Sequence, residues 1–210
     1  MQPNERAEEA RAHWEGVYGK ATQNGVSWYR PHLETSLRLI QSAVGPGAAI
    51  LDVGGGHSTL ADDLTACGYR NLTVCDISET ALAHARQRLG ETAGQVRWLA
   101  GDIRDLSLPE RGFDLWHDRA VFHFFTAAED RQAYVRQVEA TVKPGGHVVI
   151  ATFGPQGPMK CSGLEVCRYD ADTLAEVFGS RFRLAESLIE VHETPFHTQQ
   201  QFLYCHFLAN

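Results

Sequence analysis

The chain has 210 residues, of which 43% are hydrophobic and 21% are charged, and these proportions exclude an intrinsically disordered chain. Its length is that of one α/β domain, and no apolar run approaches the ~20 residues that a membrane-spanning helix needs. The net charge is −7 and the chain contains no cluster of lysine or arginine, which argues against nucleic acid as a partner.

The five cysteines are scattered and form no C-x-x-C pair, as is typical of proteins from a reduced compartment. Residues 1–12 are polar and acidic, and they lack the apolar core of a secretory signal. We therefore expect a cytoplasmic protein without a membrane partner. The oligomeric state is left open.

Two helices and an aromatic loop are predicted before the first strand. The helices span residues 5–18 and 34–44, and the loop over residues 26–31 contains Trp28 and Tyr29. Two adjacent aromatic side chains in a loop cannot both enter one core. They either pack as a lid over the edge of the sheet, or one of them closes over a bound cation, which an aromatic face attracts.

A strand over residues 48–53 runs directly into the turn Gly54-Gly55-Gly56, and a helical pattern follows. Glycines let a ligand approach the main chain closely, and the helix start offers free N–H groups. This arrangement predicts a site for a polar or anionic ligand. A nicotinamide dinucleotide is disfavoured, because Asp52 would repel its pyrophosphate and Thr59 stands where the dinucleotide motif has its third glycine.

The next two strands also lead to acids. The strand over 72–76 ends at Asp76, about 20 residues after the glycine turn, where nucleoside-binding α/β folds place an acid on the ribose hydroxyls. Alternatively Asp76 caps the following helix, although Ser78 is better placed for that role. The strand over 95–99 is followed by Asp102. Carboxylates gathered at one sheet edge repel each other unless a ligand satisfies them, so we expect the ligand site there.

The second half of the chain continues the alternation and then departs from it. A glycine- and proline-rich loop over 154–168 is expected to lie over the carboxyl edge of the sheet. Two alternating segments near the end predict an antiparallel hairpin. The predicted helices are 60–67, 79–89, 129–142 (ended by Lys143-Pro144-Gly145-Gly146) and 170–178, and the predicted strands are 113–117, 148–153, 182–192 and 200–207.

The motif Asp52-Val53-Gly54-Gly55-Gly56-His57-Ser58 resembles the first motif of class I S-adenosylmethionine-dependent methyltransferases, [DE]-x-G-x-G-x-G, with Ser58 in place of the last glycine. The resemblance covers roughly residues 14–153. It implies a doubly wound three-layer α/β sandwich with a mostly parallel seven-stranded sheet and a C-terminal antiparallel hairpin. We expect one methyltransferase domain with an N-terminal helical lid (1–45), a cofactor-binding core (46–153) and a substrate-side loop and hairpin (154–210).

The same resemblance implies roles for particular residues around S-adenosylmethionine and its product S-adenosylhomocysteine. Asp76 would hold the ribose and Asp102 the adenine amino group, with Ile77 and Ile103 beside them. The remaining cofactor contacts implied are Trp28, Tyr29, Asp52, Gly54, Gly56, Ser58 and His117.

The segment after the fourth strand supplies the candidates for chemistry. His117 is a candidate base, or it hydrogen-bonds a main-chain group. Arg119 forms an ion pair with Asp118, attracts an anionic acceptor, or binds the cofactor carboxylate. The ten histidines show no firm metal-ligand spacing, so no metal is expected. Cys161 and Cys167 flank the loop near this edge, and their roles are left open.

A finer resemblance concerns the methyl acceptor. The run Trp116-His117-Asp118-Arg119-Ala120-Val121, with Arg131, Tyr134 and Pro144-Gly145-Gly146 after it and Trp14 and Trp28 before it, is similar to thiopurine and small-thiol methyltransferases. A related segment with Asp-Lys-Gly occurs in protein-lysine methyltransferases. We expect a small soft nucleophile such as a thiol as acceptor, in a pocket of Trp28, Tyr29, Arg119, Phe153 and Cys161. The alternatives are a protein-lysine methyltransferase, a nicotinamide-dependent oxidoreductase, or a cofactor-binding protein without catalysis.

Overall fold

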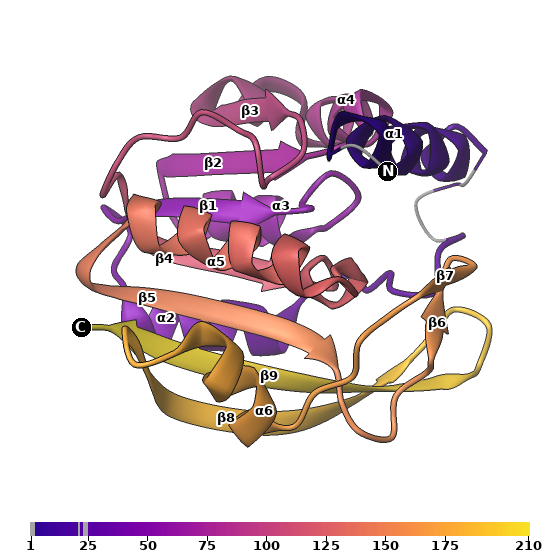
Figure 1. The fold of residues 1–210 in the computed structure, drawn as a ribbon. Helices are drawn as coiled ribbons and strands as arrows, with labels where there is room; N and C mark the ends of the chain where they lie inside the picture. Colours follow the sequence, from indigo (N-terminus) through magenta and orange to yellow (C-terminus); the bar gives the residue numbers. More distant parts are fainter. Residues whose placement is uncertain (1–2, 21, 23–24) are drawn as a thin grey trace.

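The computed structural model describes residues 3–20, 22 and 25–210, and in this part of the chain a seven-stranded sheet forms the centre of the molecule (Figure 1). Its strand order is β3-β2-β1-β4-β5-β9-β8. The first five strands in this order are parallel to one another, and β9 is antiparallel to both β5 and β8. The strands are β1 (Ala49–Val53), β2 (Asn71–Asp76), β3 (Val96–Ala100), β4 (Phe113–Arg119), β5 (Val142–Phe153), β8 (Phe182–Glu193) and β9 (Gln199–Ala209). The predicted sheet and its antiparallel C-terminal hairpin are confirmed.

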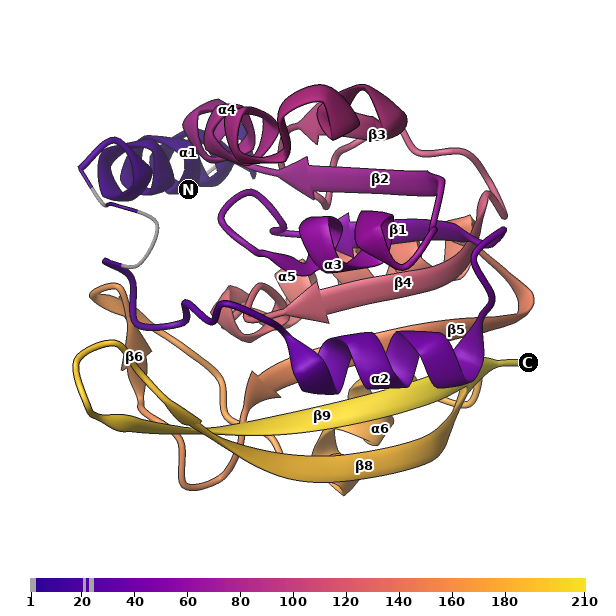
Figure 2. The ribbon, with the colours of Figure 1, turned by 180° about the vertical axis from the view of Figure 1, so that it is seen from behind.

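Helices cover both faces of this sheet, which makes the three layers. Residues of α5 (Ala128–Thr141) and α6 (Ala171–Phe178) enter one buried cluster, in front of the sheet in Figure 1. Residues of α2 (Glu34–Ala43), α3 (Leu60–Ala66) and α4 (Glu79–Leu89) enter the other, and Figure 2 shows α2 and α3 in front of the sheet. Strands buried on both faces read as continuous apolar runs, as β1 and the end of β5 do.

Local sequence signals set the boundaries of the helices. The Ser78 side chain accepts the Ala81 N–H and caps α4, and Gly90 ends that helix with a positive φ of 58°. Asp170 and Thr173 form a reciprocal capping box at the start of α6. The cap at Ser78 is the one that the sequence predicts.

Two elements differ from the prediction. Strand β5 begins at Val142, six residues before the predicted start, because Val142 pairs with Phe113 across a register irregularity. The predicted loop over 154–168 contains a short antiparallel pair, β6 (Lys160–Cys161) and β7 (Leu164–Glu165). Gly163 has a φ of 80° between them, so the turn of this hairpin uses a conformation that favours glycine. Short 3-10 helices occupy Gly90–Gln95 and Phe122–Phe124.

Helix α1 (Pro3–Tyr18) stands apart from the two covering layers. It lies beside α4, close to the end of the sheet at which β1, β2 and β4 finish (Figure 1). The parallel strands therefore bring Asp52, Asp76 and the segment after β3 to the same edge, below α1. Among the described residues, the structure contains no helix of the length and apolar character needed to cross a membrane.

Candidate active site

A pocket lies at the carboxyl edge of the parallel strands, between this edge and α1. The structure brings most of the predicted site residues to its wall. These are Trp28, Tyr29, Asp52, Gly54, Ser58, Asp76, Ile77, Asp102, Ile103, His117, Arg119 and Cys161. The three strand-end carboxylates thus face one cavity, as the acid pattern predicts.

Asp52 is held in place from beneath by a buried histidine. The Nδ1 atom of His117 lies 2.7 Å from Asp52 Oδ1, and its Nε2 atom lies 2.9 Å from the Ser36 hydroxyl of α2. His117 is 1% exposed. Both ring nitrogens therefore have protein partners, and neither is left to take a proton from a substrate. The predicted main-chain contact of His117 is wrong, because both partners are side chains, and its role as a base stays a prediction that this geometry does not support.

The second oxygen of Asp52 is buried and has no hydrogen-bond partner in the part of the chain that the structure describes. A buried carboxylate oxygen without a donor is costly, so it marks a place where a ligand donor is expected. The glycine turn lies directly over this atom, because a Cβ atom on Gly55 would come within 2.4 Å of Asp52 Oδ2. Gly54 has a φ of 69°, and a Cβ atom there would meet the Val121 side chain at 2.2 Å. Consecutive glycines are required here for space and for backbone conformation.

Asp76 is a buried acceptor at the end of β2. Its Oδ1 accepts the Ser78 N–H at 2.9 Å, and its Oδ2 accepts the Gly56 N–H at 3.1 Å. Burial raises the pKa of this carboxyl group to about 6, against the two backbone hydrogen bonds that favour its ionised form. Gly56 itself is not part of the pocket wall, contrary to the prediction. It acts through its N–H, which fixes Asp76.

Asp102 is paired within its own loop. Arg104 donates from Nε to Asp102 Oδ1 at 2.9 Å and from an Nη atom to Asp102 Oδ2 at 2.5 Å. The Arg104 N–H donates to Asp102 Oδ1 as well. The sequence pattern predicts that the Asp102 carboxylate has no partner until a ligand binds. In the structure, the Arg104 guanidinium, two residues further along the chain, already compensates the charge of Asp102.

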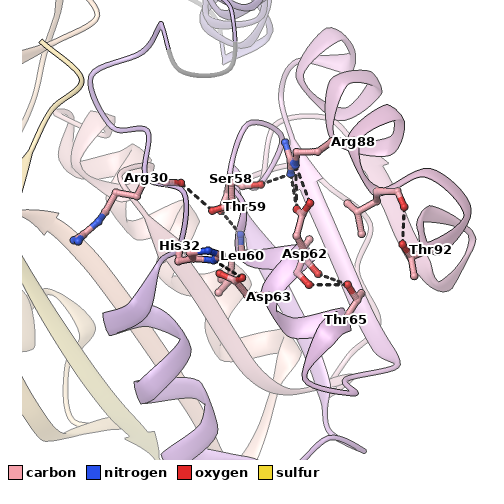
Figure 3. A network of polar contacts seen from close by, with 12 residues as sticks. Arg30, His32, Ser58, Thr59, Leu60, Asp62, Asp63, Thr65, Arg88 and Thr92 are labelled. Atoms are coloured by element: carbon pink, nitrogen blue, oxygen red, sulfur yellow. Dashed lines mark hydrogen bonds and ion pairs between the residues drawn. The ribbon is translucent and has the colours of Figure 1, made fainter.

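The far side of the glycine turn is held by a polar network between the aromatic loop, α3 and α4 (Figure 3). Arg88 of α4 binds the Asp62 carboxylate with two nitrogens and donates to the Ser58 carbonyl. The Ser58 hydroxyl accepts the Leu60 N–H, and the Thr59 hydroxyl donates to the Arg30 carbonyl. The turn is thereby fixed to both neighbouring segments before any ligand binds.

Arg119 projects from the end of β4 into the other side of the pocket. Its Nε donates to the Tyr204 hydroxyl at 3.0 Å, Nη1 donates to the Trp28 carbonyl at 3.1 Å, and its guanidinium lies 4.3 Å from the Phe202 ring centroid. The Nη2 atom is buried and has no hydrogen-bond partner within residues 3–20, 22 and 25–210. No ion pair with Asp118 forms, so that expectation is wrong: Asp118 instead accepts the Tyr134 hydroxyl and the N–H groups of Val121 and Phe122.

Phe153 is the second predicted pocket residue that the structure places elsewhere. Its side chain is 1% exposed and packs on the rings of His123 and Phe202, beneath the pocket. Because β5 is buried on both faces at this end, the side chain of its last residue enters the core and not the cavity.

Several pocket residues are not predicted by the sequence patterns. Helix α1 contributes Arg6, Ala10, Trp14 and Tyr18, which are spaced four apart and therefore share one face of the helix. The Trp14 ring is stacked on Tyr18 and meets Trp28 and Phe124 edge-on. The four-residue spacing of Trp14 and Tyr18 is visible in the sequence, but the sequence does not show that this face of the helix lines the pocket. His57 and Arg104 are also missed, because their places depend on the folded turns.

Cys161 lies in the pocket wall and is buried, and burial raises the pKa of its thiol to about 11. It is therefore a neutral thiol at physiological pH. Cys167 is not part of this wall. It accepts a hydrogen bond from Arg131. Among the described residues, no group of three His, Cys, Asp or Glu side chains is arranged to hold a metal ion.

Comparisons with known proteins agree with this geometry. A family model described as "Methyltransferase domain" matches residues 50–146. The zebrafish "EEF1A lysine methyltransferase 2" is 25% identical over 193 residues, which are 85% of this chain and 77% of that protein. The mouse "eEF1A lysine and N-terminal methyltransferase" is 24% identical over 137 residues, 65% of this chain, and the chain spans only 19% of that relative's length.

A solved structure shows the same fold. It is the Burkholderia thailandensis 1,6-didemethyltoxoflavin-N1-methyltransferase with bound 1,6-didemethyltoxoflavin and S-adenosylhomocysteine, at a TM-score of 0.75 and 21% identity, covering 100% of this chain and 91% of that one. The comparisons agree with the sheet order and the glycine turn: residues 50–146 match a methyltransferase domain, and the chain has the fold of class I methyltransferases. Enzymes of this class use S-adenosylmethionine as their cofactor. The thiopurine-like resemblance finds only loose support in these comparisons.

The pocket fits this cofactor by the chemistry of its donors and acceptors. A nucleoside offers hydroxyl donors for a buried carboxylate such as Asp76, and a methionine moiety offers an ammonium group for the unpartnered oxygen of Asp52. The glycine turn leaves the space that side chains would fill. The rings of Trp14, Tyr18 and Trp28 form an aromatic wall, which suits a sulfonium cation.

Proposed function

We propose that the protein transfers the methyl group of S-adenosylmethionine to a small, soft nucleophile that carries a negative charge, a thiol bearing a carboxylate being the type case. The observation that carries this proposal is the Arg119 guanidinium. It is positioned by Tyr204 and the Trp28 carbonyl, it lines the pocket, and its Nη2 atom is buried without a partner among the residues whose structure is described. A buried donor on a permanent cation calls for an anionic acceptor group.

In this proposal the cofactor occupies the acidic side of the pocket. Asp52 accepts the ammonium group of its methionine moiety, Asp76 accepts the ribose hydroxyls, and Asp102 lies at the adenine amino group. Gly54, Ser58, Ile77 and Ile103 line the space between these groups. Ser58 acts with its main chain fixed, since Arg88 holds its carbonyl.

The bound cofactor supplies an electrophilic methyl group on a positively charged sulfur, and the chain has to place a nucleophile in line with it. Well-oriented reacting pairs reach effective molarities of about 10⁵–10⁸ M, so positioning alone can supply much of the acceleration. Arg119 would hold the acceptor's anionic group, and Trp28, Tyr29 and Phe124 would exclude water around it. Since His117 has no free nitrogen, no base is assigned, and a nucleophile that is already ionised suits the site.

A protein-lysine acceptor is the second candidate, because relatives named as lysine methyltransferases match the chain. The charge of Arg119 opposes it, since an unpaired guanidinium repels the ammonium group of a protonated lysine. The cup that Arg119 shares with Cys161 and Leu164 is also walled by the β6–β7 hairpin, which favours a small molecule. We further propose a cytoplasmic location, since all five cysteines are free thiols.

A labelled-methyl screen tests the proposal. Radiolabelled S-adenosylmethionine is incubated with the protein and with three sets of acceptors: small thiols with a carboxylate, the same thiols as amides, and lysine-containing peptides. We expect label in the first set at the highest rate, with Asp76→Ala as the inactive control. Label in peptides alone would replace the acceptor class by lysine. Stabilisation of the protein by NADH but not by S-adenosylhomocysteine would refute methyl transfer altogether.

A further inference from the structure

A network of four side chains with alternating charge crosses the wall of the pocket, from the loop after β3 to helix α1. Asp102 is bound by Arg104, and Arg104 also donates to Asp130 at the start of α5. Asp130 in turn accepts a hydrogen bond from Arg6 of α1 at 3.4 Å. These four residues come from three segments that are far apart in the sequence, and all four line the pocket.

The centre of this charge network is shielded from water. The Arg104 side chain is 11% exposed and that of Asp102 is 7% exposed, whereas Arg6 at the outer end is 32% exposed. The Arg104 guanidinium also lies 5.1 Å from the Phe125 ring centroid, and the Arg104 carbonyl accepts a hydrogen bond from Gln137 of α5. Ion pairs with this degree of burial are poorly screened by salt and hold a fixed geometry.

Helix α1 is attached to the domain near its start and near its end. Near its start, Arg6 binds Asp130. Near its end, the Glu15 carboxylate accepts the Glu79 N–H at 2.7 Å, at the start of α4 and three residues after Asp76. Between these attachments, Ala10 and Trp14 face the cavity. Helix α1 therefore bridges α5 and α4 across the pocket. A ligand in the pocket would contact Arg6 and Asp130, which are also residues that attach this helix to the domain.

We infer that Arg6, Asp130 and Arg104 are positioning residues that couple the docking of α1 to the carboxylate of Asp102, so that closing the helix and binding the adenine end of the cofactor stabilise each other. This inference rests on the proposed cofactor site. Two events that share one network have a coupling free energy, and the coupling is reciprocal. Release of Arg6 weakens the hold on Arg104 through Asp130, and a reoriented Arg104 changes the place of Asp102.

A double-mutant cycle on S-adenosylhomocysteine affinity tests the coupling. Isothermal titration is done on the intact protein and on Arg6→Met, Asp102→Asn and the double variant. We expect about a threefold loss for Arg6→Met, the size of a partly exposed ion pair. The double variant should bind about as weakly as Asp102→Asn alone. Asp130→Asn, which keeps the side-chain shape but removes the charge that joins Arg104 to Arg6, should weaken binding at least as much as Arg6→Met.

The matched control is Arg11→Met, which removes the same group from an exposed position of the same helix that lies outside the pocket. Hydrogen exchange of the α1 amides gives a second readout. S-adenosylhomocysteine should slow this exchange in the intact protein and in Arg11→Met, but much less in Arg6→Met. Equal affinities of Arg6→Met and Arg11→Met, or independent effects in the cycle, would overturn the coupling and leave the cofactor site standing. No binding to the intact protein would overturn the proposed function itself.

Discussion

The two halves of the pocket are built in different ways. In the proposed cofactor half, Asp76 and Asp102 are fixed by partners within 20 residues in the chain, such as the Ser78 and Gly56 N–H groups on Asp76, and only Asp52 is held by a distant residue, His117. In the acceptor half, Arg119 is fixed by Tyr204 and by the Trp28 carbonyl, which lie 85 and 91 residues away in the chain. One half is acidic and built around the turns that follow three neighbouring strands, and the other is cationic, aromatic and built from segments far apart in the chain.

This difference indicates where specificity can change. The cofactor half depends on the ends of three parallel strands, so its geometry follows from the sheet. The acceptor half depends on the aromatic loop, the β6–β7 hairpin and β9, which can change without altering the sheet order. We therefore expect substitutions in the first half to affect cofactor binding, and those in the second half to affect the choice and rate of acceptor methylation.

The largest effect is expected for Asp76→Ala. The change removes the acceptor of the ribose hydroxyls and leaves the buried N–H groups of Ser78 and Gly56 unpaired. Hydrogen bonds to a charged group contribute about 1.5–3 kcal/mol each, so affinity for S-adenosylhomocysteine should fall about 100-fold or more. Titration calorimetry measures it, with the exposed Asp105→Ala on the neighbouring loop as control. An unchanged affinity would mean that Asp76 does not bind the ribose, and that the nucleoside lies elsewhere.

Arg119→Met tests the acceptor half. Loss of the guanidinium should lower kcat/KM for an anionic thiol about 30-fold, because a charge-assisted hydrogen bond disappears. Affinity for S-adenosylhomocysteine should stay within about threefold. Steady-state kinetics and calorimetry on the same preparation separate the two. If affinity for S-adenosylhomocysteine falls instead and acceptor kinetics do not change, Arg119 binds the cofactor carboxylate, and the division of the pocket is wrong.

The same division explains what the sequence could predict. Asp52, Asp76 and Asp102 each follow an apolar strand, and parallel strands bring such residues to one edge, so their meeting in one pocket was predictable. The parallel core and the C-terminal hairpin followed from the same kind of pattern. The partners of His117 were not predictable, because Ser36 reaches it from α2, a helix that a sequence pattern does not place.

The errors arise where an interaction joins distant segments. Phe153 was assigned to the pocket from its position at the end of a strand, but its side chain packs against β9, which is the last strand in the chain. Arg119 and Asp118 are adjacent in sequence, yet neighbouring residues of a strand point to opposite faces, so their ion pair does not form. The alternation of side chains along a strand is by itself enough to exclude that pair.

A smaller effect, about tenfold, is expected from pH. Burial raises the pKa of Asp76 to about 6, above its usual 3.8, so its contribution to the stability of the free protein is fully present below about pH 3.8 and is lost as the pH rises through 6. Ribose hydroxyls bind the ionised form. Affinity for S-adenosylhomocysteine should therefore be about tenfold weaker at pH 5 than at pH 7.5.

Asp118 provides the control for this pH dependence, since burial also raises its pKa to about 6 but it lies outside the pocket wall. Tyr134→Phe removes a hydrogen bond from Asp118 and leaves the surroundings of Asp76 in place. That variant should change the pH dependence of unfolding and leave the pH dependence of affinity as it is. An affinity that stays constant from pH 5 to pH 7.5 would show that Asp76 is not the titrating acceptor.

The smallest effect is expected for Cys161→Ala in the acceptor half. With its pKa raised to about 11 by burial, the thiol is neutral and contributes only apolar lining beside Leu164. The loss in kcat/KM should be about threefold or less, because the neighbouring side chains can relax partly into the space that the sulfur atom leaves. Steady-state kinetics with the acceptor found in the screen measures it, and Cys161→Ser, which adds a polar group at nearly the same volume, should cost more than the alanine. A loss of about 100-fold in both variants would mean that the sulfur takes part in the transfer, and the acceptor half would then act by chemistry as well as by position.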